Sequence, residues 1–424
     1  MNSTLEKRRK VLSSSLSLSY NKPLHIVRGN GQFLYDKNGV KYLDGINNIQ
    51  HVGHAHPRIS TAAYKQLQIL NTNTRYLDQH VIDYAERLIK KLPRKLSVCF
   101  FTNSGSESND LALRLARTYT QSSDIIVLEG AYHGHTESLI NVSPYKYKGP
   151  GGFTPPKYVH EIPMPDIRKG FYNGSGAEKR YLKILSTEID HITSQGKKPI
   201  FMFESFMGCG GQLPLPRQFL KRGHKLIKKS YGISIADEVQ TGFGRLGNHF
   251  WAFDFFDIKP DIITLGKSMG NGFPLSAVIT TKEIASRFDN GMEYFNSFGG
   301  NPVSSVVGNT VLKIIADEGL QENAKDVGQY LKRQLLELKL KNPIFGDVRG
   351  EGLFLGIEIV DLEQDKTPHP ILANYIVNKM RDKSILLSVD GPKKNIIKIK
   401  PPLPFNKENA DFLIENFYKV LLSL

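Results

Sequence analysis

The feature that most limits the fold is a series of short apolar runs that alternate with stretches of helical periodicity. These runs are four to six residues long and cover 97–102, 125–128, 199–204, 233–237 and 262–265. Runs of this length are typical of buried strands in a parallel sheet, where each connection needs a crossover of a dozen or more residues. Helical patterns are predicted over 59–70, 78–92 and 109–119. The sequence therefore predicts an α/β protein with a large, doubly wound, mostly parallel sheet.

The two ends of the chain have a different residue pattern, with short strands and turns. Residues 23–45 form three short strand patterns, and Lys37-Asn38-Gly39 is a hairpin-turn signal between the last two. The last hundred residues return to short elements with hairpin-like turns, and 141–176 is predicted to be a long irregular loop. We predict a large domain over 57–320 and a smaller α+β domain built from 1–56 and 321–424.

Small and aromatic residues follow two of the predicted strands. The segment 102–110 (TNSGSESND) leads from a strand into a helix, where free backbone N–H groups can cradle a phosphate. Tyr132-His133-Gly134 follows the strand 125–128, and an aromatic side chain there can stack on a flat ring. Taken alone, both signals are weak, because strand-to-helix turns are often rich in Gly and Ser and such a tyrosine is more often part of the core.

A carboxylate and a lysine end two further strands. Asp237 closes the run 233–237, and a buried carboxylate needs a cation such as a protonated pyridine nitrogen. The alternatives for Asp237 are a metal ligand or a helix cap, although no second metal ligand stands at a usable spacing. Lys267 follows the run 262–265, where partial burial favours the neutral amine that attacks an aldehyde. Strand C-termini are where open α/β sheets bind ligands.

A phosphate cradle, a stacking ring, an anion for a ring nitrogen and an amine for an aldehyde are together what pyridoxal 5′-phosphate (PLP) requires. The motifs that carry these groups, SGSESN, AYHGH, ADEVQTGFGR, LGKSMGNGFP, SFGGNP and VRGEGLFLGIE, resemble those of the class III (subgroup II) aminotransferases. The resemblance runs from residue 42 to residue 405 and implies PLP fold type I.

The resemblance assigns roles to individual positions. Lys267 is similar to the lysine that forms the Schiff base and moves the proton, and Asp237 to the partner of the pyridine nitrogen. A threonine that reaches the PLP phosphate of the neighbouring subunit is replaced by Ser297, which implies a homodimer with shared active sites, or a tetramer. The remaining cofactor contacts implied are Gly105, Ser106, Tyr132, His133, Val239 and Gln240.

Finer resemblance points to one branch of the family. The stretches 45–57, 70–88, 293–302 and 386–402 resemble phospho-lyases that act on ethanolamine phosphate or 5-phosphohydroxylysine. In that branch Lys267 would remove a proton from the carbon that bears the amine, phosphate would leave from the next carbon, and an aldehyde and ammonia would follow. A departing phosphate needs fixed cations and donors. The candidates are Arg75, His51, His54 and Lys400, with Asn71 and Asn73 as neutral donors.

Two other readings stay open. The first is an ω-aminotransferase that passes the amine to a 2-oxo acid, whose carboxylate Arg349 would hold. The second is an inactive PLP-binding scaffold, against which the intact Lys267 and Asp237 argue. Glu204, at the end of the strand 199–204, is expected to line the pocket. The histidines of 51–56 (HVGHAH) could also form a metal cluster, but no carboxylate ligand accompanies them, and we predict no metal site.

The composition of the chain limits the kinds of partner and compartment that we expect. The formal net charge is +15, yet basic residues are spread along the chain and no nucleic-acid-binding module is present, so we expect a small anionic amine substrate and no nucleic acid. Two cysteines without metal or disulfide spacing favour a reducing, cytoplasmic compartment, and no apolar run is long enough to cross a membrane. The basic, Ser-rich segment 7–20 resembles a transit peptide but is predicted to be a docked segment.

Overall fold

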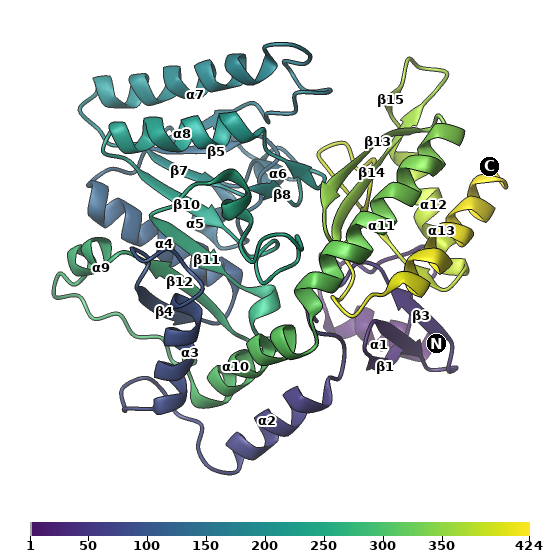
Figure 1. Cartoon of the computed structure of the whole chain (residues 1–424), viewed down its shortest axis with the longest axis horizontal. Coiled ribbons are helices and arrows are strands. Elements are labelled where there is room, and N and C mark those ends of the chain that lie inside the picture. The colour runs from purple at the N-terminus through teal and green to yellow at the C-terminus, as the bar shows by residue number, and fades with distance from the viewer. Residues whose placement is uncertain (1) are drawn as a thin grey trace.

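The computed structural model describes residues 2–424, and its largest feature is a seven-stranded sheet (Figure 1). The strand order is β4-β12-β11-β10-β7-β5-β6, and only β12 runs against the others. The bounds are β4 Val98–Thr102, β5 Ile125–Leu128, β6 Val159–Ile162, β7 Ile200–Phe203, β10 Ile233–Asp237, β11 Ile262–Leu265 and β12 Ser276–Thr280. The predicted α/β class with a mostly parallel sheet is confirmed.

Alternate side chains of each strand pack on opposite faces of this sheet. In β7, Ile200 and Met202 belong to one apolar cluster, whereas Phe201 and Phe203 belong to the other. The first cluster is covered by α4 (Gly105–Thr120) and α9 (Lys282–Phe288), and the second by α7 (Ala177–Ser194) and α8 (Arg217–Lys229). Because both faces are buried, the strands are apolar throughout rather than alternating, as their sequences predict.

The two ends of the chain meet in a second body, on the right in Figure 1. A four-stranded sheet joins β1 (Ile26–Asn30), β2 (Phe33–Asp36) and β3 (Lys41–Asp44) to β16 (Ile385–Leu386). The predicted hairpin at Lys37-Asn38-Gly39 joins β2 and β3, and Gly39 has a φ of +82°. A further sheet contains β13 Phe345–Glu351, β14 Phe354–Asp361, β15 Thr367–Pro368, β17 Ser388–Asp390 and β18 Ile396–Ile399.

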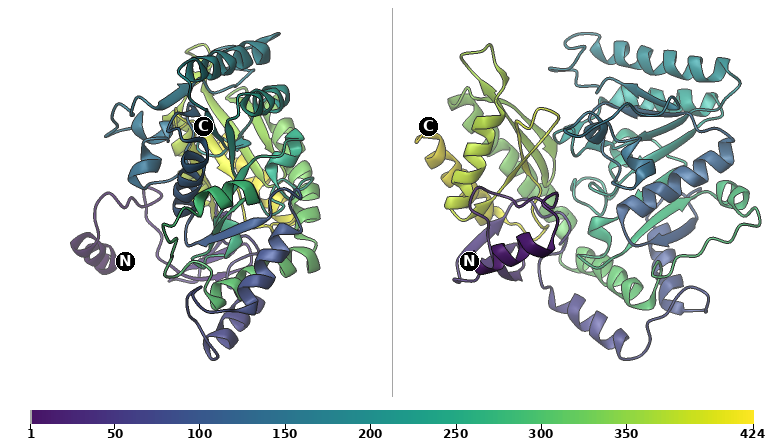
Figure 2. Two further views of the ribbon diagram at one scale, coloured as in Figure 1. Left: turned by 90° about the vertical axis from the view of Figure 1, so that its left-hand side faces the viewer. Right: turned by 180° about the vertical axis from the view of Figure 1, so that it is seen from behind.

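Long helices cover this second body and link it to the first. Helix α11 (Leu320–Lys341) packs on β13 and on α13 (Lys407–Leu421), and α12 (Pro370–Asp382) packs on α13. Helix α10 (Pro302–Asp317) packs on α2 (Pro57–Leu67) and α3 (Gln79–Ile89) below the large sheet. The boundary predicted at 320 lies at the junction of α10 and α11, and the division into domains stays a prediction. Helix α1 (Asn2–Val11) projects from the body in Figure 2.

Two local predictions need correction. The segment 141–176 contains α6 (Pro144–Tyr147) and the edge strand β6, which its Pro- and Gly-rich flanks hid. Helix α4 begins at Gly105 rather than at 109, because the Ser104 side chain accepts a hydrogen bond from the N–H of Glu107 and caps a start of low helix propensity. The remaining short elements are α5 Glu137–Ile140, β8 Phe206–Met207, β9 Leu213–Pro214 and the 3₁₀ turns Ala252–Phe256 and Lys267–Met269. Among the described residues no helix is long and apolar enough to span a membrane.

Candidate active site

A cavity of about 220 Å³ lies at the C-terminal ends of the parallel strands, and we call it the strand-end cavity. Strands β4, β5, β7, β10 and β11 each lead into segments that supply part of its wall. It is lined by Ser104, Gly105, Ser106, Asn109, Tyr132, His133, Gly134, His135, Glu204, Asp237, Val239, Gln240 and Lys267. The structure therefore brings together all the predicted cofactor contacts except Ser297, and it adds Ser104, Asn109, Gly134 and His135.

Asp237 is buried at the end of β10 and is held by three donors. Asn109 Nδ2 donates to its Oδ2 at 2.8 Å, His133 Nδ1 lies 2.9 Å from the same oxygen, and the N–H of Val239 donates to Oδ1 at 3.1 Å. Such bonds fix the carboxylate in one orientation and stabilise its charge. Asn109 was not identified from the sequence; the available signal was a polar residue in the first turns of a helix that follows a Ser-rich cap.

Lys267 begins a 3₁₀ turn directly after β11. Its φ of +31° is unusual for a side chain other than glycine, and strain of this kind clusters at functional sites. The preceding residue is Gly266, where a Cβ atom would lie 3.2 Å from the backbone of Gly105. This close approach brings the lysine next to the first turn of α4.

The first turn of α4 lies where the sequence predicts the phosphate cradle. A Cβ atom at Gly105 would lie 2.9 Å from Val239 Cγ1, and one at Gly134 would lie 2.8 Å from Ser106 Oγ. Side chains at these two positions would therefore fill the space where the helix offers its free N–H groups. Ser106 Oγ lies 3.0 Å from Nδ1 of His135, which accounts for a histidine in the wall.

One buried carboxylate completes the wall. Glu204 is buried and accepts hydrogen bonds from the N–H groups of Gly208 at 3.0 Å and Tyr132 at 3.3 Å. Burial, followed by the nearby charge of Asp237, raises the pKa of Glu204 to about 7. Glu204 thus lines the cavity as predicted, and it is placed to exchange a proton near neutral pH.

Lys400 reaches this wall from the other body. Its ammonium donates to Gln240 Oε1 at 2.9 Å, and its side chain is only 3% exposed. Burial lowers the pKa of Lys400 to about 8. Asp390 lies 3.7 Å from Lys400 and 3.3 Å from Lys398, so two lysines share one carboxylate and one positive charge remains in excess beside the cavity.

Arg349 does not line the strand-end cavity. Its Nε donates to the carbonyl of Gly211 at 2.7 Å, and its Nη1 pairs with Asp166 at 3.5 Å and Asp347 at 3.9 Å. Asp166 therefore balances the guanidinium that the aminotransferase reading assigns to an acceptor, and Asp347 is shared with Arg168, whose Nη1 lies 3.1 Å from it.

His51 also lies outside the cavity, contrary to its prediction as a substrate residue. It is fully buried, its Nε2 lies 2.7 Å from the carbonyl of Phe243, and its Nδ1 lies 3.1 Å from Arg245 Nη2. Burial lowers the pKa of His51 well below its usual value, so it is a neutral packing residue. His54 pairs with Asp44, and His56 pairs with Glu318. The three histidines therefore contact different partners and do not converge on one position for a metal ion.

Arg75 and Ser297 lie on the surface of the chain. Arg75 pairs with Glu293 at 3.0 Å and stacks over the ring of Phe295 at 4.3 Å. Ser297 is exposed on the same loop as Phe295. The two asparagines predicted as neutral donors form hydrogen bonds with the backbone instead. Asn71 Oδ1 accepts from the N–H of Val303, and Asn73 Oδ1 accepts from the N–H of Arg75. Within one chain none of these residues reaches the strand-end cavity.

The donor set fits the cofactor expected from the sequence. The glycine-lined helix start suits a phosphate, the buried carboxylate held by Asn109 and His133 suits a ring cation, and Lys267 suits an aldehyde. Tyr132 and Val239 supply the aromatic and aliphatic walls for a flat ring.

Comparisons with known proteins point the same way. The family model described as "Aminotransferase class-III" matches residues 17–421. The chain is 43% identical over 435 residues to a Drosophila melanogaster protein named "Alanine--glyoxylate aminotransferase 2-like", covering 99% of this chain and 87% of that one. It is 40% identical over 421 residues to "Ethanolamine-phosphate phospho-lyase homolog 1" of Caenorhabditis elegans, covering 96% and 90%.

Solved structures agree on the fold. An Arthrobacter phospholyase in complex with phosphoethanolamine has a TM-score of 0.93 and 36% identity, covering 99% of this chain and all of that one. An amine transaminase from an uncultivated Pseudomonas species, in its PLP-bound form, has a TM-score of 0.87 and 25% identity, covering 97% and 98%. The predicted PLP fold type I is therefore confirmed.

Proposed function

The chain belongs to the class III aminotransferase family, whose cofactor is PLP, and on this premise we propose that it is a phospho-lyase. The substrate is the phosphate ester of a small amino alcohol, ethanolamine phosphate or 5-phosphohydroxylysine. One water is consumed, and an aldehyde, ammonia and inorganic phosphate are released. For ethanolamine phosphate the aldehyde is acetaldehyde.

The chain's residues have separate tasks in this reaction. PLP, when bound, supplies an electron sink for the carbon that carries the amine. Lys267 Nζ removes the proton from that carbon, and Asp237 would pair with the ring nitrogen and favour its protonated form. Glu204, which lines the cavity and has a pKa of about 7, is placed to hold or return a proton.

The observation that carries the proposal is the excess positive charge at Lys400. The ammonium is buried, contacts Gln240 in the cavity wall, and shares Asp390 with Lys398. A buried cation that is only half neutralised favours an anionic substrate group and stabilises phosphate as it leaves. The relatives named phospho-lyase and phospholyase support the same reading.

The alternative is an aminotransferase that uses a 2-oxo acid acceptor. The alanine–glyoxylate aminotransferase name of the Drosophila relative favours it. The pairing of Arg349 with Asp166 and Asp347 speaks against it, because an acceptor carboxylate would have to displace these partners.

Product analysis distinguishes the two reactions. PLP-loaded protein is incubated with ethanolamine phosphate and without any 2-oxo acid, and inorganic phosphate and ammonia are measured together. We expect equal release of both, with acetaldehyde. If neither appears with ethanolamine phosphate or phosphohydroxylysine, but pyruvate or 2-oxoglutarate becomes aminated, the aminotransferase reading replaces ours.

Lys400→Met is expected to weaken the binding of the phosphorylated substrate and to affect ligands without phosphate much less. Methionine keeps most of the volume but removes the buried charge, so KM for ethanolamine phosphate should rise about 30-fold, or about 2 kcal/mol. Inhibition by ethanolamine, which has no phosphate, should change much less. Lys383→Met, at the exposed end of α12, is the control for loss of a charge from the same body. Equal weakening of both ligands in Lys400→Met would reject the role of Lys400.

We also propose a homodimer through the loops that carry Arg75 and Ser297. Tyr76 is 68% exposed, Leu77 fully exposed and Phe298 70% exposed, and large exposed apolar side chains on loops that contact each other through Arg75 and Phe295 support an interaction surface. Light scattering should show a dimer for the wild type and a monomer for Leu77→Glu combined with Phe298→Glu. Leu340→Glu changes a leucine on α11 that is 86% exposed, and it should leave the dimer intact. A monomeric wild type with full activity would contradict the shared site.

A further inference from the structure

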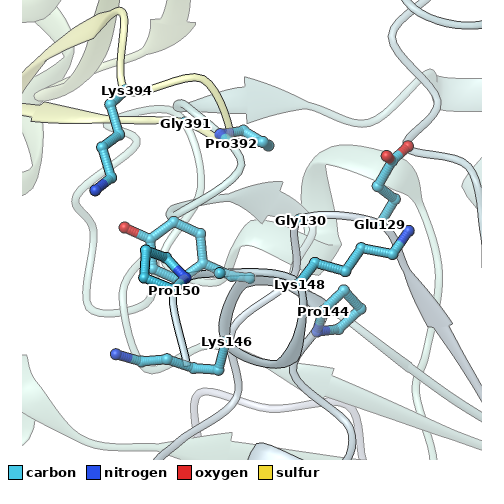
Figure 3. A pocket seen from close by; sticks show the side chains of 11 residues that line it. Glu129, Gly130, Pro144, Lys146, Lys148, Pro150, Gly391, Pro392 and Lys394 are labelled. Atoms are coloured by element: carbon cyan, nitrogen blue, oxygen red, sulfur yellow. The ribbon is translucent and has the colours of Figure 1, made fainter. Parts of the chain in front are cut away.

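A second cavity, which we call the lysine cavity, lies between the two bodies. Its volume is about 260 Å³, and Figure 3 shows it from close by. One wall is formed by α6 and the residues that follow it, including Lys146 and Lys148. The opposite wall is the turn between β17 and β18, including Lys394.

The lysine cavity and the strand-end cavity are neighbours but share no lining residue. Tyr132 lines the strand-end cavity and Tyr145 lines the lysine cavity, and their rings pack edge to face with centroids 6.2 Å apart. Lys146 Nζ lies 5.7 Å from the centroid of the Tyr132 ring. These two tyrosines therefore separate the cavities, and an anion held by the lysines would lie just outside the reaction space.

The charge of the lysine cavity is unbalanced. Of its three lysines, only Lys148 has a carboxylate partner, Glu161 at 2.6 Å. Across the described residues, no carboxylate lies within 4 Å of the ammonium of Lys146 or Lys394. Figure 3 shows these two side chains extending toward the same side of the cavity, whereas Lys148 extends toward Glu129, the single acidic residue in the lining.

The turn that carries Lys394 is held in a fixed shape. Gly391 and Lys394 have φ values of +85° and +52°, and the N–H of Gly391 donates to the carbonyl of Cys209 at 3.0 Å. A lysine in the left-handed region is strained relative to a glycine there, and the surrounding contacts have to maintain it. The turn therefore holds Lys394 so that it lines the cavity between the two bodies.

We propose that the lysine cavity binds a phosphate dianion, with Lys146 and Lys394 as its cations. A dianion needs two positive charges, and lysine ammonium groups bind phosphate as point charges without a fixed orientation. The dianion is either inorganic phosphate or the phosphate group of a monoester. The proposal depends only on this cavity and holds whether the chain is a phospho-lyase or an aminotransferase.

The test compares phosphate binding by PLP-loaded wild type with that of the double variant Lys146→Gln and Lys394→Gln. Calorimetry with inorganic phosphate, at constant ionic strength set by chloride, gives the number of sites and their affinity. Each lost contact at an exposed site is worth up to about fivefold. We therefore expect one site per chain to weaken by about tenfold or more in the double variant. The control is Lys393→Gln, on the same turn but outside the lining.

A footprint locates the site. Inorganic phosphate should protect Lys146 and Lys394 of the wild type from acetylation, measured by mass spectrometry of peptides, and should leave Lys393 unprotected. If the double variant unfolds or loses the visible absorbance of PLP, the single variant Lys394→Gln and this footprint replace it. Unchanged binding in the double variant, or equal protection by chloride at the same ionic strength, would overturn the proposal.

Competition experiments with ethanolamine phosphate and with ethanolamine show whether the cavity binds free phosphate or a phosphate monoester. If ethanolamine phosphate competes with inorganic phosphate for the site that the double variant loses, the cavity accepts monoesters and collects substrate. If only inorganic phosphate binds there, the cavity holds the free ion. Both results retain a phosphate dianion site, whereas competition by ethanolamine without phosphate would reject it.

Discussion

Lys267→Ala is expected to lower kcat by about 10⁴-fold while the chain remains folded. Among the residues that the structure describes, no other lysine lines the strand-end cavity and could replace it. The variant loses both the amine that holds the cofactor's aldehyde and the base that moves the proton. Its φ of +31° is unfavourable for lysine and alanine alike, so the free energy of unfolding should change little.

Three measurements test this expectation together. Turnover should fall, the visible absorbance of protein-bound PLP should shift, and a small added amine such as methylamine should restore part of the turnover. Lys259→Ala, an exposed lysine in the loop before β11, should match the wild type in all three. Near-normal turnover in Lys267→Ala would disprove the assignment of the lysine and with it the proposed chemistry.

Asp237→Asn is expected to lower kcat by about a thousandfold, which corresponds to about 4 kcal/mol. Asparagine has the same shape but no charge, so the ring nitrogen loses the anion that keeps it protonated. Asn109 Nδ2 and His133 Nδ1 both approach the same oxygen of Asp237, and an amide cannot replace the charge that they help to stabilise.

The adjacent carboxylate provides a matched control. Glu238 is also buried, but it accepts hydrogen bonds from the N–H groups of Ala252 and Phe253 and does not line the strand-end cavity. Burial raises the pKa of Glu238 to about 8, and Gln keeps the size and shape of this side chain. Glu238→Gln should keep kcat within about threefold. An equal loss in both variants would show that Asp237 acts through stability rather than on the cofactor.

The strand-end cavity was largely predictable from the sequence. Five short apolar runs identified strands, and the residues that end or closely follow these strands were placed at one edge of the sheet, as they are in the structure for Asp237 and Lys267. This inference works because a parallel sheet aligns the C-terminal ends of its strands, so position along the chain fixes position at the edge. The binding roles of the individual residues stay predictions.

Residues that act through contacts between the two bodies were not predictable in this way. The sequence presented Arg349 and His51 as free polar groups, but the fold pairs Arg349 with Asp166 and places His51 against Arg245, almost two hundred residues away in the chain. Asn109 and the lysine cavity were not predicted either, because their partners come from distant segments, and the pairing of Lys398 with Asp390 depends on the hairpin of β17 and β18.

The sequence alone determined the α/β class, the strand-end residues and the chemistry of the cofactor, because these follow from local periodicity and from the residue that ends each strand. Only the tertiary structure decided which charges are neutralised and which remain free. That balance depends on ion pairs such as Asp390 with Lys398 and Lys400, and on the lysines that face the gap between the bodies. Asp390 lies close to both lysines along the chain, but strand packing and the contact between Lys400 and Gln240 set the distances between these charges.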